Sequence, residues 1–220
     1  MRKSSVILAA TVVSIAALAS SARAAVIFYG DRGSFEAANP GLPLENFEKA
    51  NIAANAAAGF AGPLNSSTSN AYFAPGDVID GFSLVPTFGD VFLGGNGFGG
   101  NASKHVSSNQ FAANIDLLFA PGALAIGLDH GGFSSGGPYV DGPWTVSVYG
   151  SSGLLGTLAL GHGGFFGVSS DEAITRLFLD KPDTGGIVDN IEFGTPVPEP
   201  GTFMLLGAGL VGLACWRRRS

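Results

Sequence analysis

Glycine and proline interrupt this chain so often that long regular elements have little room in its middle. Its 220 residues include 34 Gly and 12 Pro. Glycine takes turn conformations at no steric cost, and proline ends or kinks helices. Short apolar runs lie between these residues, and several alternate with period two, as strands with one buried face do. The pattern predicts an all-β domain of short antiparallel strands joined by many turns.

The apolar runs and the turn residues between them predict the following strands. They cover residues 26–29, 44–47, 82–85, 91–93, 115–119, 124–129, 144–149, 154–160, 165–169, 174–179 and 187–193. Residues 32–39 carry the one helical pattern, and residues 50–76 have few large apolar groups and are expected to form a long loop. This spacing is typical of an antiparallel β-sandwich of the jelly-roll kind. No fixed period repeats, which argues against a solenoid and against the threonine ladder of a flat ice-binding face.

The N-terminal end has the composition of a secretory signal peptide. Two basic residues precede an apolar run at residues 6–18, and Ala22 and Ala24 stand where a signal peptidase reads small side chains. The run is shorter than the about 20 residues that a membrane-spanning helix needs. We therefore expect a signal helix and signal peptide at residues 1–24, with cleavage leaving Ala25 as the first residue.

The C-terminal end has three parts in a fixed order. They are the proline-flanked stretch Val197, Pro198, Glu199 and Pro200, the apolar run 202–216, and the basic cluster Arg217, Arg218 and Arg219. The prolines keep the first part extended and without helical hydrogen bonds. The apolar run is again short for an ordinary anchor, and the arginines keep the end of the chain in the cytoplasm. The pattern predicts a short transmembrane helix outside the folded domain.

These three parts together resemble the PEP-CTERM protein-sorting signal, a region that also goes by the name ice-binding protein C-terminal domain. The resemblance covers residues 196–220 and implies export by a Gram-negative bacterium. It also implies recognition by an exosortase, a transpeptidase-like membrane enzyme that cuts near Pro-Glu-Pro. The implied precursor is anchored in the inner membrane, and the mature protein, from Ala25 to about Pro198, is expected outside the cell or on its surface. An anchor that is never cut is the alternative.

The domain expected at residues 25–195 is strongly acidic. Residues 25–196 hold five basic against sixteen acidic side chains, a balance of −11. Such a surface repels phosphate backbones and excludes nucleic acid as a partner, whereas divalent cations and neutral sugars remain compatible with it. The single cysteine, Cys215, lies in the C-terminal apolar run, so no disulfide can form within the domain. Packing, or a metal ion, must hold the domain together.

Asp189 is the most informative polar residue of the domain. Period-two alternation places it on the same face as the apolar residues of strand 187–193, so its side chain is expected to point into the core. A buried carboxylate needs a cation, an arginine or several backbone donors. Glu48 in an early strand and Asp189 in the last one resemble carbohydrate-binding jelly rolls, in which residues of these strands hold a structural calcium ion. The resemblance implies Glu48 and Asp189 as calcium ligands, and a hydrogen-bonded Asp189 without metal is the alternative.

Tyr139 and Trp144 are candidate ligand-binding residues, because aromatic faces stack on the C–H groups of sugars. Core packing is the alternative for both. No order of Ser, His and Asp in the sequence suggests a catalytic triad, so we expect no enzyme.

The sequence thus favours a structural or adhesive protein of the exopolysaccharide matrix. A carbohydrate-binding module that recognises matrix glycans is the alternative. A glycan hydrolase is the third possibility, and it would need two carboxylates at a set separation across a groove.

Overall fold

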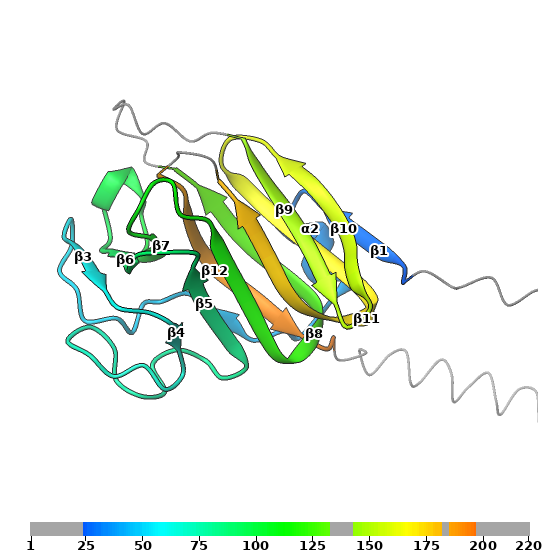
Figure 1. Cartoon of the computed structure of the whole chain (residues 1–220), viewed down its shortest axis with the longest axis horizontal. Helices are drawn as coiled ribbons and strands as arrows, with labels where there is room; N and C mark the ends of the chain where they lie inside the picture. Colours follow the sequence, from blue (N-terminus) through cyan, green and yellow to red (C-terminus); the bar gives the residue numbers. More distant parts are fainter. Residues whose placement is uncertain (1–23, 133–142, 182–184, 197–220) are drawn as a thin grey trace, which may run out of the picture.

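The computed structural model describes residues 24–132, 143–181 and 185–196. Over these residues it contains a single antiparallel sheet of twelve strands, a short α-helix and a 3-10 turn (Figure 1). In chain order the elements are β1 (Val26–Tyr29), α2 (Arg32–Ala38), β2 (Leu44–Glu45), β3 (Ala57–Phe60), β4 (Leu64–Asn65), β5 (Phe82–Pro86), β6 (Val91–Gly94), η1 (Phe98–Gly100), β7 (His105–Ser108), β8 (Ile115–Gly131), β9 (Trp144–Gly150), β10 (Gly153–Leu160), β11 (Gly164–Asp180) and β12 (Ile187–Gly194). The all-β prediction is confirmed.

Two strands of 17 residues, β8 and β11, form the middle of the sheet. They pair with each other at both of their ends, and the register shifts between Ser169 and Ile174. At one end their outer neighbours are β12 and β1, and at the other end they are β5 and β9. The full order is β10-β9-β11-β8-β12-β7-β6-β3, with β1 on β11, β2 on β12, β5 on β8 and β4 on β5. Every other strand thus joins this central pair directly or through one to three intervening strands.

The sequence predicts a break in each of these long strands, whereas the structure continues both. Pro121 and Gly122 interrupt the apolar pattern of β8, and Gly122 has a φ of 115°, which glycine adopts at little cost. An irregularity of this kind bends a strand without reversing it. Four of the predicted strands are therefore two bent ones. The described strands form one continuous sheet, so the predicted two-sheet sandwich is not confirmed.

Three further strands were missed. β3 and β4 lie in the expected long loop at residues 50–76, where β3 pairs with β6 and β4 with β5. β7 has the sequence His-Val-Ser-Ser, which shows no apolar run, yet all four residues are buried between β6 and β12. Pairing with neighbours far along the chain decides these segments, and local propensity does not.

A single cluster of buried apolar side chains draws on both ends of the central pair. Leu117 and Leu177 come from one end, and Ile126 and Val168 from the other, and all four are fully buried. Phe47, Phe82 and Phe193 join the same cluster. The described residues contain no cysteine and hence no disulfide, and burial of this apolar cluster stabilises the described domain.

Helix α2 lies where the sequence predicts a helix, and it packs on the sheet through Phe35. Asp31 caps its first turn by accepting a hydrogen bond from the Ser34 amide (2.8 Å). The Phe35 ring is buried above Gly127 of β8 and Gly167 of β11, which are paired residues. A Cβ atom on Gly127 would lie 2.7 Å from Phe35, and one on Gly167 would lie 2.8 Å from it. The helix can approach the sheet because neither position carries a side chain.

Replacing Gly127 with alanine should push Phe35 away from the sheet and lower the free energy of unfolding by about 1–3 kcal/mol, the usual cost of overpacking a core. Urea denaturation of the purified protein measures this change. Gly161→Ala is the matched control, because a Cβ atom there meets nothing within 4 Å. Equal effects of the two substitutions would contradict the proposed role of the glycine pair.

Candidate functional site

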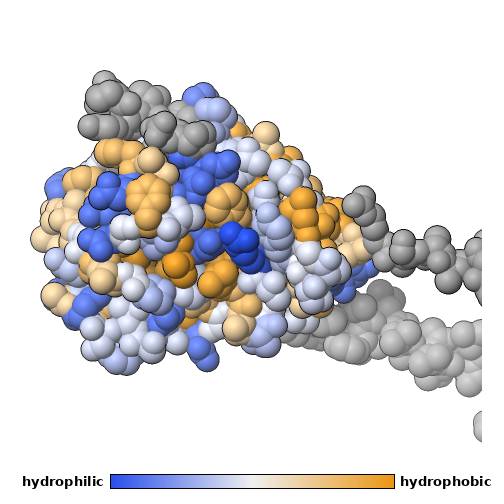
Figure 2. Space-filling model, viewed as in Figure 1, coloured by the Kyte–Doolittle hydropathy of each residue, from blue (hydrophilic) through white to orange (hydrophobic). Residues whose placement is uncertain are grey.

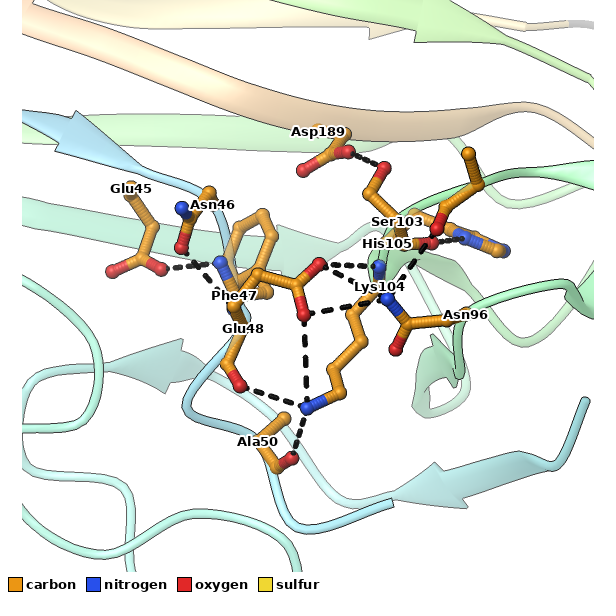
Figure 3. A network of polar contacts seen from close by, with 11 residues as sticks. Glu45, Asn46, Phe47, Glu48, Ala50, Asn96, Ser103, Lys104, His105 and Asp189 are labelled. Atoms are coloured by element: carbon orange, nitrogen blue, oxygen red, sulfur yellow. Dashed lines mark hydrogen bonds and ion pairs between the residues drawn. The ribbon is translucent and has the colours of Figure 1, made fainter. Parts of the chain in front are cut away.

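A polar network lies where the chain leaves β2 and passes beside β7 and β12 (Figure 3). Glu45 is buried, and its carboxylate accepts hydrogen bonds from the amides of Phe47 (2.7 Å) and Ile79 (2.8 Å). Phe47 has a φ of 55°, a left-handed conformation that is uncommon for an aromatic residue. The ring of Phe47 enters the core, while Glu48, the next residue, is exposed. The buried Glu45 carboxylate thus fixes the turn that presents Glu48 to the network.

Lys104 is the centre of one half of this network. Its Nζ donates hydrogen bonds to the carbonyl oxygens of Glu48 (2.7 Å) and Ala50 (2.9 Å) and lies 3.8 Å from Glu48 Oε2. The backbone amide of Lys104 donates to Glu48 Oε1 (3.0 Å). The side chain is 14% exposed, so the ammonium group is held close to the protein surface by oxygen atoms. A cation of the chain itself, Lys104, therefore lies beside the Glu48 carboxylate.

Asp189 is the centre of the other half, and it is 5% exposed. Its Oδ2 accepts a hydrogen bond from Ser103 Oγ, and its Oδ1 accepts one from the Asn190 amide (2.7 Å). The Asn190 side chain also donates to Asp129 Oδ2 (2.9 Å), and Asn190 has a φ of 47°. Burial raises the pKa of Asp189 to about 6, helped by the negative charges of Asp129 and Glu48 and opposed by the hydrogen bonds from Ser103 and Asn190. The expectation that Asp189 points inward agrees with this burial.

Arg32, at the start of α2, joins the helix to the adjoining strands. Its Nη2 lies 3.0 Å from Asp129 Oδ1 and donates to the carbonyl of Asn190 (3.1 Å), and its Nη1 contacts the Glu192 carboxylate. The guanidinium group also stacks over the Phe165 ring, 4.8 Å from its centroid. One cation therefore links α2 with β8, β11 and β12.

Sequence reasoning missed Arg32, Ser103 and Lys104 as members of this site. The signal that could have found the two cations is their scarcity. All five basic residues of 25–196 contact an oxygen of the described chain. Besides Arg32 and Lys104, Arg176 pairs with Asp116, and Lys49 and Lys181 donate to the carbonyls of Gly76 and Phe111 (both 3.4 Å). In a domain with sixteen acidic side chains, each cation can be expected to have such a partner.

The network gives Glu48 and Asp189 different partners, and no cation is shared between them. Lys104 holds Glu48, whereas Ser103 and Asn190 hold Asp189. Within the described ranges, no group of three or more His, Cys, Asp or Glu side chains is arranged to hold a metal ion. Calcium takes six to eight oxygen ligands, and the carbonyl oxygens beside Glu48 already surround an ammonium group. The described residues therefore do not fit a shared calcium ion, which stays a prediction of the sequence.

The structure describes one of the two predicted sugar-binding aromatics, Trp144. Trp144 is 1% exposed and belongs to the core cluster, with its ring 5.6 Å from that of His130. Its prediction as an exposed stacking platform is wrong. The indole at the start of β9 is buried in the apolar core, which is the core-packing alternative. Tyr139 lies outside the described residues.

The predicted processing sites lie mostly outside the described residues. Ala22 and the predicted sorting residues Val197, Pro198, Glu199, Pro200, Arg217, Arg218 and Arg219 are among those not described. Ala24 and Ala25 are described, and the Ala25 amide donates to Asp171 Oδ1 (2.8 Å) just before β1 begins. The first strand therefore starts immediately after the predicted signal-peptide cleavage position.

Comparison with protein families places the PEP-CTERM protein-sorting motif on residues 196–219. The chain carries a PEP-CTERM sorting motif. The motif directs a protein to export and to the cell surface or the extracellular space, and an exosortase is the kind of enzyme that processes it. The predicted resemblance is thus confirmed for this segment. Comparisons with curated proteins and with solved structures give no significant match. In the part of the chain that the structure describes, no helix is long and apolar enough to cross a membrane.

Replacing Asp189 with asparagine should remove a pH dependence of stability. The folded-state pKa of Asp189 is raised from 3.8 to about 6, so its protonated form favours folding below pH 4, and this contribution is lost as the pH rises through about 6. From pH 4 to pH 7, wild type should lose on the order of 2–3 kcal/mol of unfolding free energy relative to the Asp189→Asn variant. Urea denaturation across this range measures the difference. The exposed Asp90→Asn variant should show no such difference, and a constant gap between wild type and Asp189→Asn would refute the assignment.

Replacing Lys104 with glutamine should leave the carbonyls of Glu48 and Ala50 without their cation and lower the unfolding free energy by about 1–3 kcal/mol. Lys49→Gln is the matched control, because Lys49 makes one long hydrogen bond, 3.4 Å to the Gly76 carbonyl. The wild-type melting curve should be the same with and without EDTA, because an ammonium group holds these oxygens. A drop in melting temperature on adding EDTA, reversed by adding calcium, would instead support the predicted calcium ion.

Proposed function

We propose that the protein is a non-enzymatic structural or adhesive component of the exopolysaccharide matrix, delivered there by processing at both ends. A signal peptidase removes the N-terminal segment, and an exosortase cuts near Pro198, Glu199 and Pro200 while the short apolar run anchors the precursor in the inner membrane. The PEP-CTERM motif at residues 196–219 is the observation that carries this proposal.

The positions of the two ends of the domain support this route. Val26, at the start of β1, pairs with Ser170 of β11, and Ala125 of β8 pairs both with Ser169 and with Gly194, the last residue of β12. The two ends are thus three strand spacings apart, roughly 15 Å. In Figure 1 the start of β1 and the end of β12 both lie toward the right-hand side of the domain. We place this side toward the inner membrane in the anchored precursor.

The polar chemistry of the domain supports a role without catalysis. Acidic groups that lie close together, such as Asp129, Asp189 and Glu192, are bound by Arg32, Ser103 and Asn190 and so serve to join elements. The excess of acidic side chains keeps copies of the domain soluble and repels nucleic acid. We interpret the fold as jelly-roll-like, with the two ends of one bent sheet taking the place of two sheets around the core.

Carbohydrate recognition by this domain is the second candidate. It is favoured by two hydroxyl-rich hollows beside residues 65–70, whose linings hold one carboxylate and no Lys or Arg. This role is compatible with a matrix location, since a protein that binds neutral glycan could adhere through it.

The proposal can be tested in the native host by replacing Pro198, Glu199 and Pro200 with alanine. Wild-type protein should give a product from Ala25 to about Pro198 in the exopolysaccharide fraction, as intact mass shows. The variant should accumulate in the membrane fraction with Arg217, Arg218 and Arg219 still present. Pro75→Ala, at an exposed proline away from the motif, is the control and should behave like wild type.

Two results would overturn the proposal. Release of the triple variant at the wild-type level would show that the sorting motif is not needed for processing. Recovery of the mature wild-type protein from the medium, with none bound to polysaccharide, would refute the matrix role while leaving processing intact.

A further inference from the structure

Two adjoining hollows lie on either side of the segment 65–70, whose sequence is Asn-Ser-Ser-Thr-Ser-Asn. One, of about 430 Å³, extends toward β5 and the start of β8, and the other, of about 380 Å³, extends toward β3. They share Asn65 and Ser67 as lining residues. Both volumes fall within the range of about 300–1,000 Å³ found for ligand sites. A chain-like ligand could therefore contact both hollows across this segment.

The segment between the hollows is held in one conformation by its own hydrogen bonds. Asn65 Oδ1 accepts from the amide (2.9 Å) and the hydroxyl (2.7 Å) of Ser67, and the Asn65 amide donates to Thr68 Oγ1 (2.9 Å). Across the loop, the Gly76 amide donates to the Ser66 carbonyl (2.8 Å). A surface that is ordered before binding loses less entropy when a ligand binds.

The polar groups in the larger hollow suit hydroxyl groups. Asp80 is exposed, and its Oδ1 accepts a hydrogen bond from Ser66 Oγ (3.0 Å). Asp80 Oδ2 and Asn65 Nδ2 form no hydrogen bond with the described residues, so the lining of this hollow has one acceptor and one donor without a partner among those residues. A sugar hydroxyl both donates and accepts, so it can use both kinds of group.

The larger hollow also has apolar groups in its lining. Leu118 is 39% exposed, whereas Phe82 and Phe119, which also line the hollow, are 4% and 3% exposed. In Figure 2 the surface at lower left, where Figure 1 places β4 and the chain after it, is mostly pale with orange patches beside it. A pyranose ring, with polar hydroxyls on its rim and apolar C–H groups on its faces, matches such a mixed surface.

Charge excludes other classes of ligand. None of the described residues that line either hollow is Lys or Arg, so phosphate, sulfate and uronate groups would meet no cation there. Asp80 is the single carboxylate of the two linings, which is too few for a calcium ion with its six to eight oxygen ligands. A neutral polyhydroxylated ligand remains.

We propose that the two hollows beside residues 65–70 bind a neutral oligosaccharide that crosses this segment, with Asp80 and Asn65 as its hydrogen-bonding residues. The inference deepens the proposed function and rests on it for the source of the ligand, which is a neutral matrix glycan. It assigns recognition to this surface, away from Trp144, which is buried.

Affinity electrophoresis of the purified full chain tests this site. Native gels are cast with dextran, a galactomannan, a mixed-linkage β-glucan or alginate, or with exopolysaccharide from the native host. A polyoxyethylene detergent keeps the apolar end soluble without adding sugar head groups. At least one of the neutral polymers or the host polysaccharide should retard the protein, and alginate should not. Asp80→Asn and Asn65→Ala should each weaken retardation at least tenfold in apparent Kd.

Glu36→Gln, which removes an exposed carboxylate on α2, is the matched control and should migrate like wild type in every gel. Ser83→Ala is a second and conservative variant in the lining of the larger hollow. Melting curves check that each variant is folded. No retardation by any neutral polymer or by host polysaccharide, retardation by alginate alone, or equal retardation of wild type and Asp80→Asn would overturn the site. If these gels show no binding while the protein still fractionates with the matrix, the hollows are refuted and the proposed function stands. If the protein binds polysaccharide in these gels but is absent from the matrix fraction, the proposed function is refuted and the binding site stands.

Discussion

The pairing of β8 with β11 is the interaction on which the rest of this domain depends. The two strands run side by side over residues 115–131 and 164–180, with an irregular middle at Pro121 and Gly122 on one strand and residues 170–173 on the other. Because each strand bends there and continues, each offers an edge to different neighbours at its two ends. β12 and β1 attach at one end and β5 and β9 at the other, so the single sheet encloses a single apolar core. Loss of this ladder would separate the two groups of strands.

The few cations of the domain join parts that the ladder does not hold. Arg32 binds α2 to the end of β8 and to the middle of β12, and Lys104 holds the segment after β2 against the start of β7. These are partly buried contacts with several oxygen atoms each, and such contacts contribute more than an exposed ion pair does. Residues 25–196 contain five basic side chains. Each of them stabilises the domain most when several carbonyl and carboxylate oxygens surround its charged group. The sequence led us to predict a calcium ion beside Glu48, and in the structure the ammonium group of Lys104 lies there.

The sequence predicted those elements whose signal is local. β1, α2 and β9 carry strong apolar patterns, and their predicted positions agree with the structure to within a residue. The continuity of β8 across Pro121 and the pairing of β7 depend on distant partners, and a single sequence does not show which partners meet. At the site, alternation correctly placed Asp189 inside, but its contacts with Ser103 and Asn190 and the role of Lys104 depend on loops whose paths have no sequence signature. Trp144 was misread because an aromatic residue at a strand start has the same local pattern whether it faces solvent or the core.

All described strands lie between the two predicted cleavage sites. β1 starts at Val26, one residue after the expected new N-terminus, and β12 ends at Gly194, ahead of the PEP-CTERM motif at residues 196–219. No described strand or ladder hydrogen bond lies beyond these two points, so cleavage there removes no sheet pairing from the domain. Since neither predicted cut touches the core, sorting and folding can be separate properties of the chain. Processing would then change where the domain is held while its sheet, its polar network and its surface hollows stay as they are.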